Sequence, residues 1–260
     1  MKDIIKAQLY QLRRDKLLKI LFFVVLFLQI TNMFGAMDYN TGEVFSGGYY
    51  LINQGFYLAL LAALFGMLMT SQVCGGDFID KTTNYELMAG HKRSEVYFGR
   101  TIISIVGGLM GTVIMFSLPM ILVCVAYGFG TEILPEQAIL RLILVIFPAF
   151  RMICEIIFLV YVIKNPYIAM VVSVLIFLFG QNISMFLEKT DSVFLGMTNI
   201  IGLFTFDAYR TYSAVTLEQF YIYNGSLNSA YIVETIMGSL IIGGVFLFLG
   251  YVFFKKDDVG

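Results

Sequence analysis

Six long apolar stretches constrain this chain more than any other feature of its sequence. A bilayer core of about 30 Å requires about 20 largely apolar residues for each helix that crosses it. Stretches of that length occupy residues 17–37, 51–74, 101–127, 139–163, 166–187 and 231–254. Charged residues make up only 13% of the chain, against about 25% in soluble domains. We therefore predict an all-α polytopic membrane protein with six transmembrane helices in a single transmembrane domain, residues 1–260.

Composition and missing motifs exclude several classes of function. A net charge of −1 gives no basic excess for nucleic-acid binding, so we expect no nucleic-acid partner. No Walker A, H-E-x-x-H or G-x-S-x-G sequence occurs, so we predict no catalytic residues and no ATPase motif. Three widely spaced Cys residues and a single His offer neither a disulfide framework nor a metal site. We expect a protein that is not an enzyme and that binds no cofactor or metal itself.

The distribution of Lys and Arg predicts the orientation in the membrane. With six spans, 13 of the 17 Lys and Arg residues fall in segments on one side, and two fall in segments on the other. The positive-inside rule then places both termini and a loop over residues 75–100 in the cytoplasm. We expect residues 188–230 to form an extracellular loop. Within it, residues 193–206 are apolar but too short to span, which favours a re-entrant segment over an ordinary amphipathic loop.

The first 16 residues predict an amphipathic helix. Ile5, Leu9 and Leu12 recur at helical spacing, while Lys6 and the adjacent arginines lie off that stripe. Such a helix lies in the membrane interface, where its cations face the anionic cytoplasmic leaflet of the lipid bilayer.

The loop over residues 75–100 predicts a short cytoplasmic helix. Hydrogen-bond acceptors from Asp80 to Thr83 can cap a helix that runs through Tyr85–Met88. Gly90 can end that helix with a positive φ. A short helix held rigidly between two spans can transmit force from a partner, but a plain solvated loop has a similar composition. On the residues alone, both readings stay open.

This loop resembles the one between the second and third helices of ABC-2 type permeases, the membrane subunits of ATP-binding-cassette exporters. The matching residues are Thr83, Tyr85, Glu86, Leu87, Gly90, Arg93, Ser94, Val96 and Tyr97. Six spans, cytoplasmic termini, an interfacial helix and a long loop before the last span are similar too, so the resemblance covers essentially the whole chain. It implies a coupling helix that sits in a groove of a cytoplasmic ABC ATPase subunit, which binds the ATP and Mg. The residues to which it assigns this role are Asp80, Thr83, Tyr85, Glu86, Leu87, Gly90, Arg93 and Tyr97.

The same resemblance implies an exporter in a bacterial cell membrane that dimerises with itself or with a related permease. Small stand-alone permeases similar to this chain, rich in Phe, Tyr and Met, often export amphipathic peptides such as bacteriocins or phenol-soluble-modulin-like toxins. Peptide is therefore the expected cargo, and drugs, lipids or ions are the alternatives. Two alternatives come from other classes: a membrane sensor or scaffold without transport, and an ion-coupled secondary transporter.

Polar residues inside the spans are the candidates for a translocation path or gate. Arg151 and Glu155 are four residues apart, so they share one helix face and can pair. They follow Pro148, which can kink the helix. The pair either lines a path between protomers or forms a structural ion pair within the bundle. Sparser polarity comes from Gln29, Asn32, Gln181 and Asn182.

Overall fold

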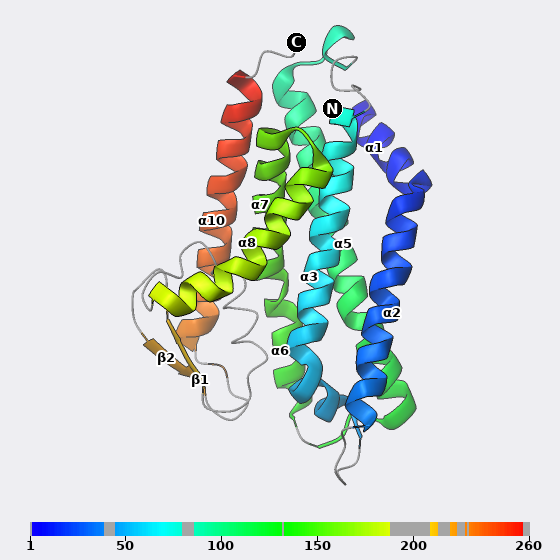
Figure 1. Cartoon of the computed structure of the whole chain (residues 1–260), viewed down its shortest axis with the longest axis vertical. Helices are drawn as coiled ribbons and strands as arrows, with labels where there is room; N and C mark the ends of the chain where they lie inside the picture. Colours follow the sequence, from blue (N-terminus) through cyan, green and yellow to red (C-terminus); the bar gives the residue numbers. More distant parts are fainter. Residues whose placement is uncertain are drawn as a thin grey trace.

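The computed structural model describes residues 2–38, 45–79, 86–131, 133–187, 209–212, 219–222, 227 and 229–256. Most of them form an elongated bundle of helices (Figure 1). Its helices are α1 (Lys2–Arg14), α2 (Lys16–Asp38), α3 (Gly47–Ile79), α5 (Arg93–Tyr127), α6 (Pro135–Leu144), α7 (Ile146–Ile163), α8 (Pro166–Leu187) and α10 (Ser229–Lys256). An antiparallel hairpin joins β1 (Tyr209–Tyr212) to β2 (Gln219–Ile222).

Five helical segments of the described chain are long and apolar enough to cross a membrane, which supports a helical membrane protein. They are Lys16–Phe34, Tyr57–Gly76, Arg93–Tyr127, Pro135–Ile163 and Tyr231–Lys256. These segments coincide with five of the six predicted spans. The helix α8 has the bounds of the remaining one, but the part whose side chains are described, Pro166–Ile176, is shorter than a crossing requires. The sixth span stays a prediction.

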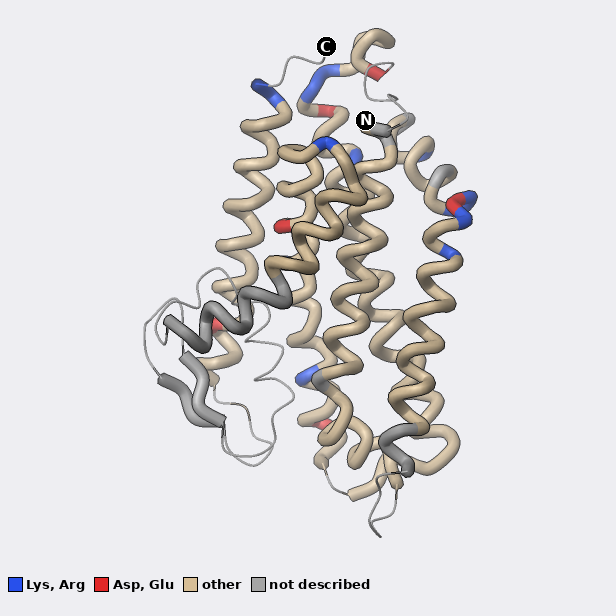
Figure 2. The backbone as a smooth tube through the Cα atoms, viewed as in Figure 1, with Lys and Arg blue, Asp and Glu red and all other residues tan. Residues whose placement is uncertain are grey.

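Both ends of the chain lie at the same end of the bundle. In Figure 1 the helices α3, α7 and α10 run toward that end, and α2 and α5 run away from it. Figure 2 shows that most Lys and Arg residues also gather there. The fold therefore has the charge asymmetry that the positive-inside rule uses, and its cytoplasmic assignment remains a prediction.

The helix α1 packs against the bundle with a different stripe from the predicted one. Ile4 and Gln8, one helical turn apart, are buried, whereas Leu9 is 50% exposed. Ile5 and Leu12 are partly buried against a small apolar cluster on α2, α3 and α5. The helix is present as predicted, and packing on α5 buries the residues at i and i+4 from Ile4. The contact of Ile5, Leu9 and Leu12 with the membrane interface stays a prediction.

The predicted fourth span, 139–163, is two helices rather than one. The break falls at Val145, which keeps a right-handed conformation with φ −57 and ψ −26. Pro148 explains it, because proline has no N–H to donate to the carbonyl of Leu144 and its ring crowds that same carbonyl. The helix is therefore interrupted about one turn before the proline that the sequence singles out, and a kink at this place stays a prediction.

The predicted loop over residues 188–230 contains the hairpin, where the sequence analysis expected no strand. Its strands include Tyr209, Tyr212 and Phe220, and aromatic residues favour extended pleated backbone. The expectation of an all-α chain is thus incomplete at this place. The predicted re-entrant segment, 193–206, lies outside the described residues.

The antiparallel pair α3 and α5 forms the centre of the bundle, and glycines allow its close approach. A Cβ added to Gly66 would clash with the hydroxyl of Thr112 and the carbonyl oxygen of Gly108. Across the same contact, Thr70 Oγ1 donates a hydrogen bond of 3.2 Å to the carbonyl oxygen of Ser104. Small residues at helix contacts in membranes bring the two backbones together in this way.

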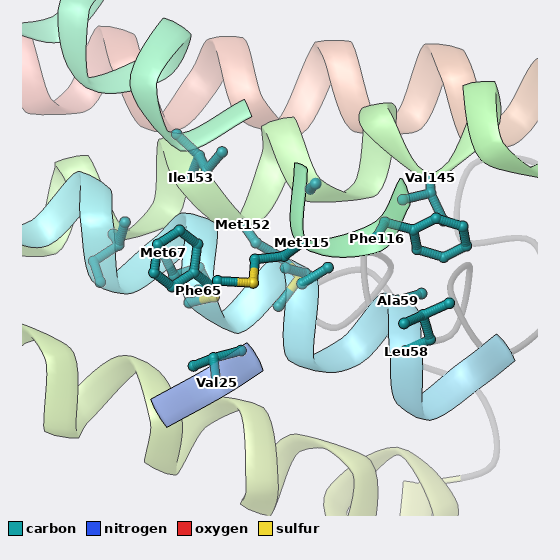
Figure 3. Packing of buried hydrophobic residues seen from close by; sticks show 14 of the residues in the cluster. Val25, Leu58, Ala59, Phe65, Met67, Met115, Phe116, Val145, Met152 and Ile153 are labelled. Atoms are coloured by element: carbon teal, nitrogen blue, oxygen red, sulfur yellow. The ribbon is translucent and has the colours of Figure 1, made fainter. Parts of the chain in front are cut away.

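Apolar side chains from α2, α3, α5 and α7 fill the interior around that pair (Figure 3). Met67, Met115 and Met152 lie among buried aromatic and aliphatic residues. Methionine is flexible and polarisable, so it fills irregular gaps between helices that cross at different angles.

Replacement of Gly66 by Ala should lower stability by about 1–3 kcal/mol, because the new methyl group overpacks the α3–α5 contact. The matched control is Gly76→Ala in the same helix, where an added Cβ meets nothing within 4 Å. Thermal unfolding of both purified variants in one detergent checks this. Equal midpoints for the two variants would contradict the close packing.

Candidate functional site

The candidate site is the polar connection between α3 and α5. Three of its predicted residues, Asp80, Thr83 and Tyr85, lie outside the described residues. The described part begins with a helical turn over residues 86–88, and this turn ends at Gly90, whose φ is 90°.

Two backbone hydrogen bonds close this turn. The N–H of Gly90 donates to the carbonyl oxygen of Leu87 at 3.1 Å, and the N–H of His91 donates to that of Glu86 at 3.3 Å. This pair of bonds is a Schellman motif, in which a residue with positive φ ends a helix. The predicted role of Gly90 as a helix terminator is confirmed.

An ion pair with a buried guanidinium and a partly buried carboxylate fastens the turn to α5. The Nη2 atom of Arg100 lies 2.8 Å from Oε2 of Glu86, and the side chain of Arg100 is 0% exposed, that of Glu86 19%. Sequence reasoning missed Arg100 as a site residue and counted it only as a loop charge. The available signal was its position within an apolar helical run, since a charge placed there usually has a partner.

The segment Met88–Gly90, which we call the loop tip, projects from this anchored turn. Met88 is 83% exposed, and Ala89 and Gly90 are also exposed. Leu87 points the other way and packs on the hydrophobic core. The result is a small apolar projection on a rigid base at the end of the bundle where most cations gather (Figure 2).

The start of α5 is tied to the end of α10. Arg93 Nη1 donates to the carbonyl oxygen of Lys255 at 3.2 Å, and the hydroxyl of Tyr97 donates to that of Leu247 at 2.6 Å. The ring of Tyr97 also lies within an aromatic cluster that joins α3, α5, α7 and α10. Its members are Phe78, Tyr97, Tyr161, Tyr251 and Phe254.

Arg151 and Glu155, the predicted gate pair, are buried within this chain, with 1% and 9% exposure. A residue that lines a path between protomers is open to the surface of a single chain, so their burial is what a structural pair would show. Whether they gate a path stays a prediction.

The other predicted polar residues are scattered over the fold. Gln29 on α2 is buried, and neither of its amide atoms has a hydrogen-bond partner among the described residues. Asn32 is partly exposed, and the backbones of Gln181 and Asn182 belong to α8. The helices α2 and α7 both pack on α3 and α5, but they lie on different sides of that pair (Figure 1), so the structure does not gather Gln29 with Arg151.

The described residues contain no group of three or more His, Cys, Asp or Glu side chains that could hold a metal ion. No model of a known protein family matches the chain, and no curated protein matches it either. Function is therefore inferred from the residues and geometry of this chain.

Replacement of Tyr97 by Phe should lower stability by about 1 kcal/mol, because it removes the hydroxyl that donates to the carbonyl of Leu247 while the ring contacts remain. Tyr167→Phe is the control, since Tyr167 is exposed on α8. Thermal unfolding of both variants measures the difference, and an unchanged midpoint for the Tyr97 variant would contradict the proposed tie between α5 and α10.

Proposed function

We propose that this chain is the membrane-spanning permease subunit of an ABC exporter of the ABC-2 type. In this proposal the end of the bundle that carries both termini and the loop tip faces the cytoplasm of a bacterial cell. A separate ATPase subunit binds ATP and Mg and presses on the loop tip. The chain itself is a transport subunit and not an enzyme.

The anchoring of the loop tip is the observation that supports this proposal. A connection that merely joins α3 to α5 has no need for a buried ion pair, and burying charges is costly unless they are paired. Here the Glu86–Arg100 pair and the Schellman motif hold an exposed apolar tip rigidly between two candidate spans. A rigid tip can transmit a push to the helices, whereas a slack loop would absorb it.

The route of that push follows from the contacts of α5. Arg100 lies on α5, and Arg93 and Tyr97 join the same helix to α10. Displacement of the tip would therefore move α3, α5, α7 and α10 as a unit relative to a second permease, either another copy or a related chain. Such a movement would open a path outward.

An amphipathic peptide is the cargo that we propose. The exposed apolar faces of α2 and α5 carry Phe, Met, Ile and Val side chains, which suit lipid, a second permease and an amphipathic substrate alike. Drugs, lipids and ions are the alternative cargoes.

One observation favours an alternative class. A charge pair buried in α7 is also what an ion-coupled secondary transporter requires. A sensor or scaffold without transport would instead use the same loop tip to dock a different cytoplasmic protein.

Purification of the tagged protein from its native membrane in mild detergent should recover a Walker A ATPase in stoichiometric amount by mass spectrometry. Gly90→Pro should lose that partner, because proline cannot adopt the positive φ that ends the turn. Gly90→Asn is the control, since Asn tolerates this conformation. Intact, folded wild-type protein without an ATPase would overturn the exporter assignment in favour of a carrier or scaffold.

Arg151→Gln should destabilise the fold by about 3–5 kcal/mol, because it leaves the carboxylate of Glu155 buried without its neighbouring charge. The double variant Arg151→Met with Glu155→Leu should fold and transport normally, since apolar residues often replace a buried pair at no loss. Thermal unfolding measures the stability of both variants, and transport into membrane vesicles measures the activity of the double variant. A folded double variant that no longer transports would show that the pair gates the path.

A further inference from the structure

We infer that Glu86 positions the loop tip from inside the bundle, and that Met88 and Ala89 are the residues that contact the cytoplasmic partner. The resemblance to ABC-2 permeases places Glu86 in the coupling helix without separating these two roles. The identity of the partner rests on the proposed function. The positioning role of Glu86 does not, because it involves only residues of this chain.

The carboxylate of Glu86 is engaged in the ion pair with Arg100. Its Oε2 atom lies 2.8 Å from Arg100 Nη2, and the guanidinium of Arg100 is fully buried. Hydrogen bonds between two charged groups are among the strongest in proteins. If Glu86 turned away to bind a partner, it would lose its contact with the buried guanidinium of Arg100, and breaking such a pair is costly. The carboxylate therefore faces α5 and stays there.

Met88 faces the opposite way. A helix turns by about 100° per residue, so the side chains two positions apart point about 200° apart around the turn. Glu86 is directed inward, and Met88 is accordingly 83% exposed. Ala89 and Gly90 beside it are small, so the thioether stands clear of its neighbours.

The chemistry of the tip indicates the kind of surface that receives it. Methionine is flexible and apolar, and it adapts its shape to a hydrophobic groove. The tip carries no charge between Glu86 and His91. We therefore expect the partner to receive the tip in an apolar groove. The rim of that groove would contact the His91–Glu95 pair, whose Nδ1 and Oε2 atoms are 3.8 Å apart.

The positioning role is tested on the permease alone. Glu86→Ala should lower the thermal midpoint by roughly 5–10 °C, because it removes the carboxylate that pairs with the buried guanidinium of Arg100. The control Glu95→Ala, in which the acid is 44% exposed, should change it little. The charge swap Glu86→Arg with Arg100→Glu should recover most of the loss. Equal effects of the two alanine substitutions would overturn the positioning role.

Co-purification with the charge swap separates positioning from contact. If Glu86 only positions the tip, the swapped pair restores partner recovery along with the midpoint. If Glu86 itself binds the partner, the reversed charge repels it, and the stable swapped variant fails to recover the partner. That second result would overturn the inference.

The contact role of Met88 is tested in the assembled complex. A photo-crosslinking amino acid at position 88 should join the permease to its ATPase, whereas the same probe at the exposed position of Phe98 should not. Met88→Glu should lose the partner without a change in thermal midpoint. Full partner recovery by Met88→Glu would overturn the contact role. If the wild type captures no ATPase, the proposed function and the contact role fall together, while the midpoint measurements still decide the role of Glu86.

Discussion

Close packing of α3 against α5 is the contact on which the other helices depend. Hydrocarbon offers no hydrogen-bond partners and no hydrophobic drive between helices, so association relies on tight van der Waals contact and on polar groups satisfied within the bundle. Gly66 and Gly108 remove the side chains that would separate the two backbones, and Thr70 bonds across to the carbonyl of Ser104. The helices α1, α2 and α7 then pack on this pair.

At the end where the termini lie, polar and aromatic contacts take over from apolar packing. The aromatic cluster joins four helices, and hydroxyl and guanidinium groups bond to carbonyl oxygens of α10. Carbonyls near a helix C-terminus lack intrahelical donors, so Arg93 satisfies at Lys255 a group that would otherwise need water. The described part of the connection between α3 and α5, residues 86–92, is thereby tied to α5, and α5 is tied to α10.

The proposed coupling to an ATPase requires that the loop tip be held firmly. An external subunit can do work on a membrane bundle only through a part that does not deform when pushed. The loop tip is uncharged and exposed, while the residues directly before it are held by a buried charge pair. Exposure and anchoring thus lie within three residues of one another, on opposite sides of one helical turn.

The sequence by itself determined which segments are long and apolar enough to cross a membrane, and where two of the helical segments end. Hydropathy and length located the five candidate spans. Pro148 predicted the interruption of the fourth span, and Gly90 predicted the end of the loop turn. These features depend only on residues that are neighbours in the sequence. Tertiary structure decided which side chains meet. Hydropathy reports the depth of a residue in the membrane but not its neighbour, so it could not pair Glu86 with Arg100 or choose Ile4 over Leu9 as the buried face of α1. Those choices come from helices brought together by packing, and a helix that is apolar on several faces does not encode by itself which face its neighbour will cover.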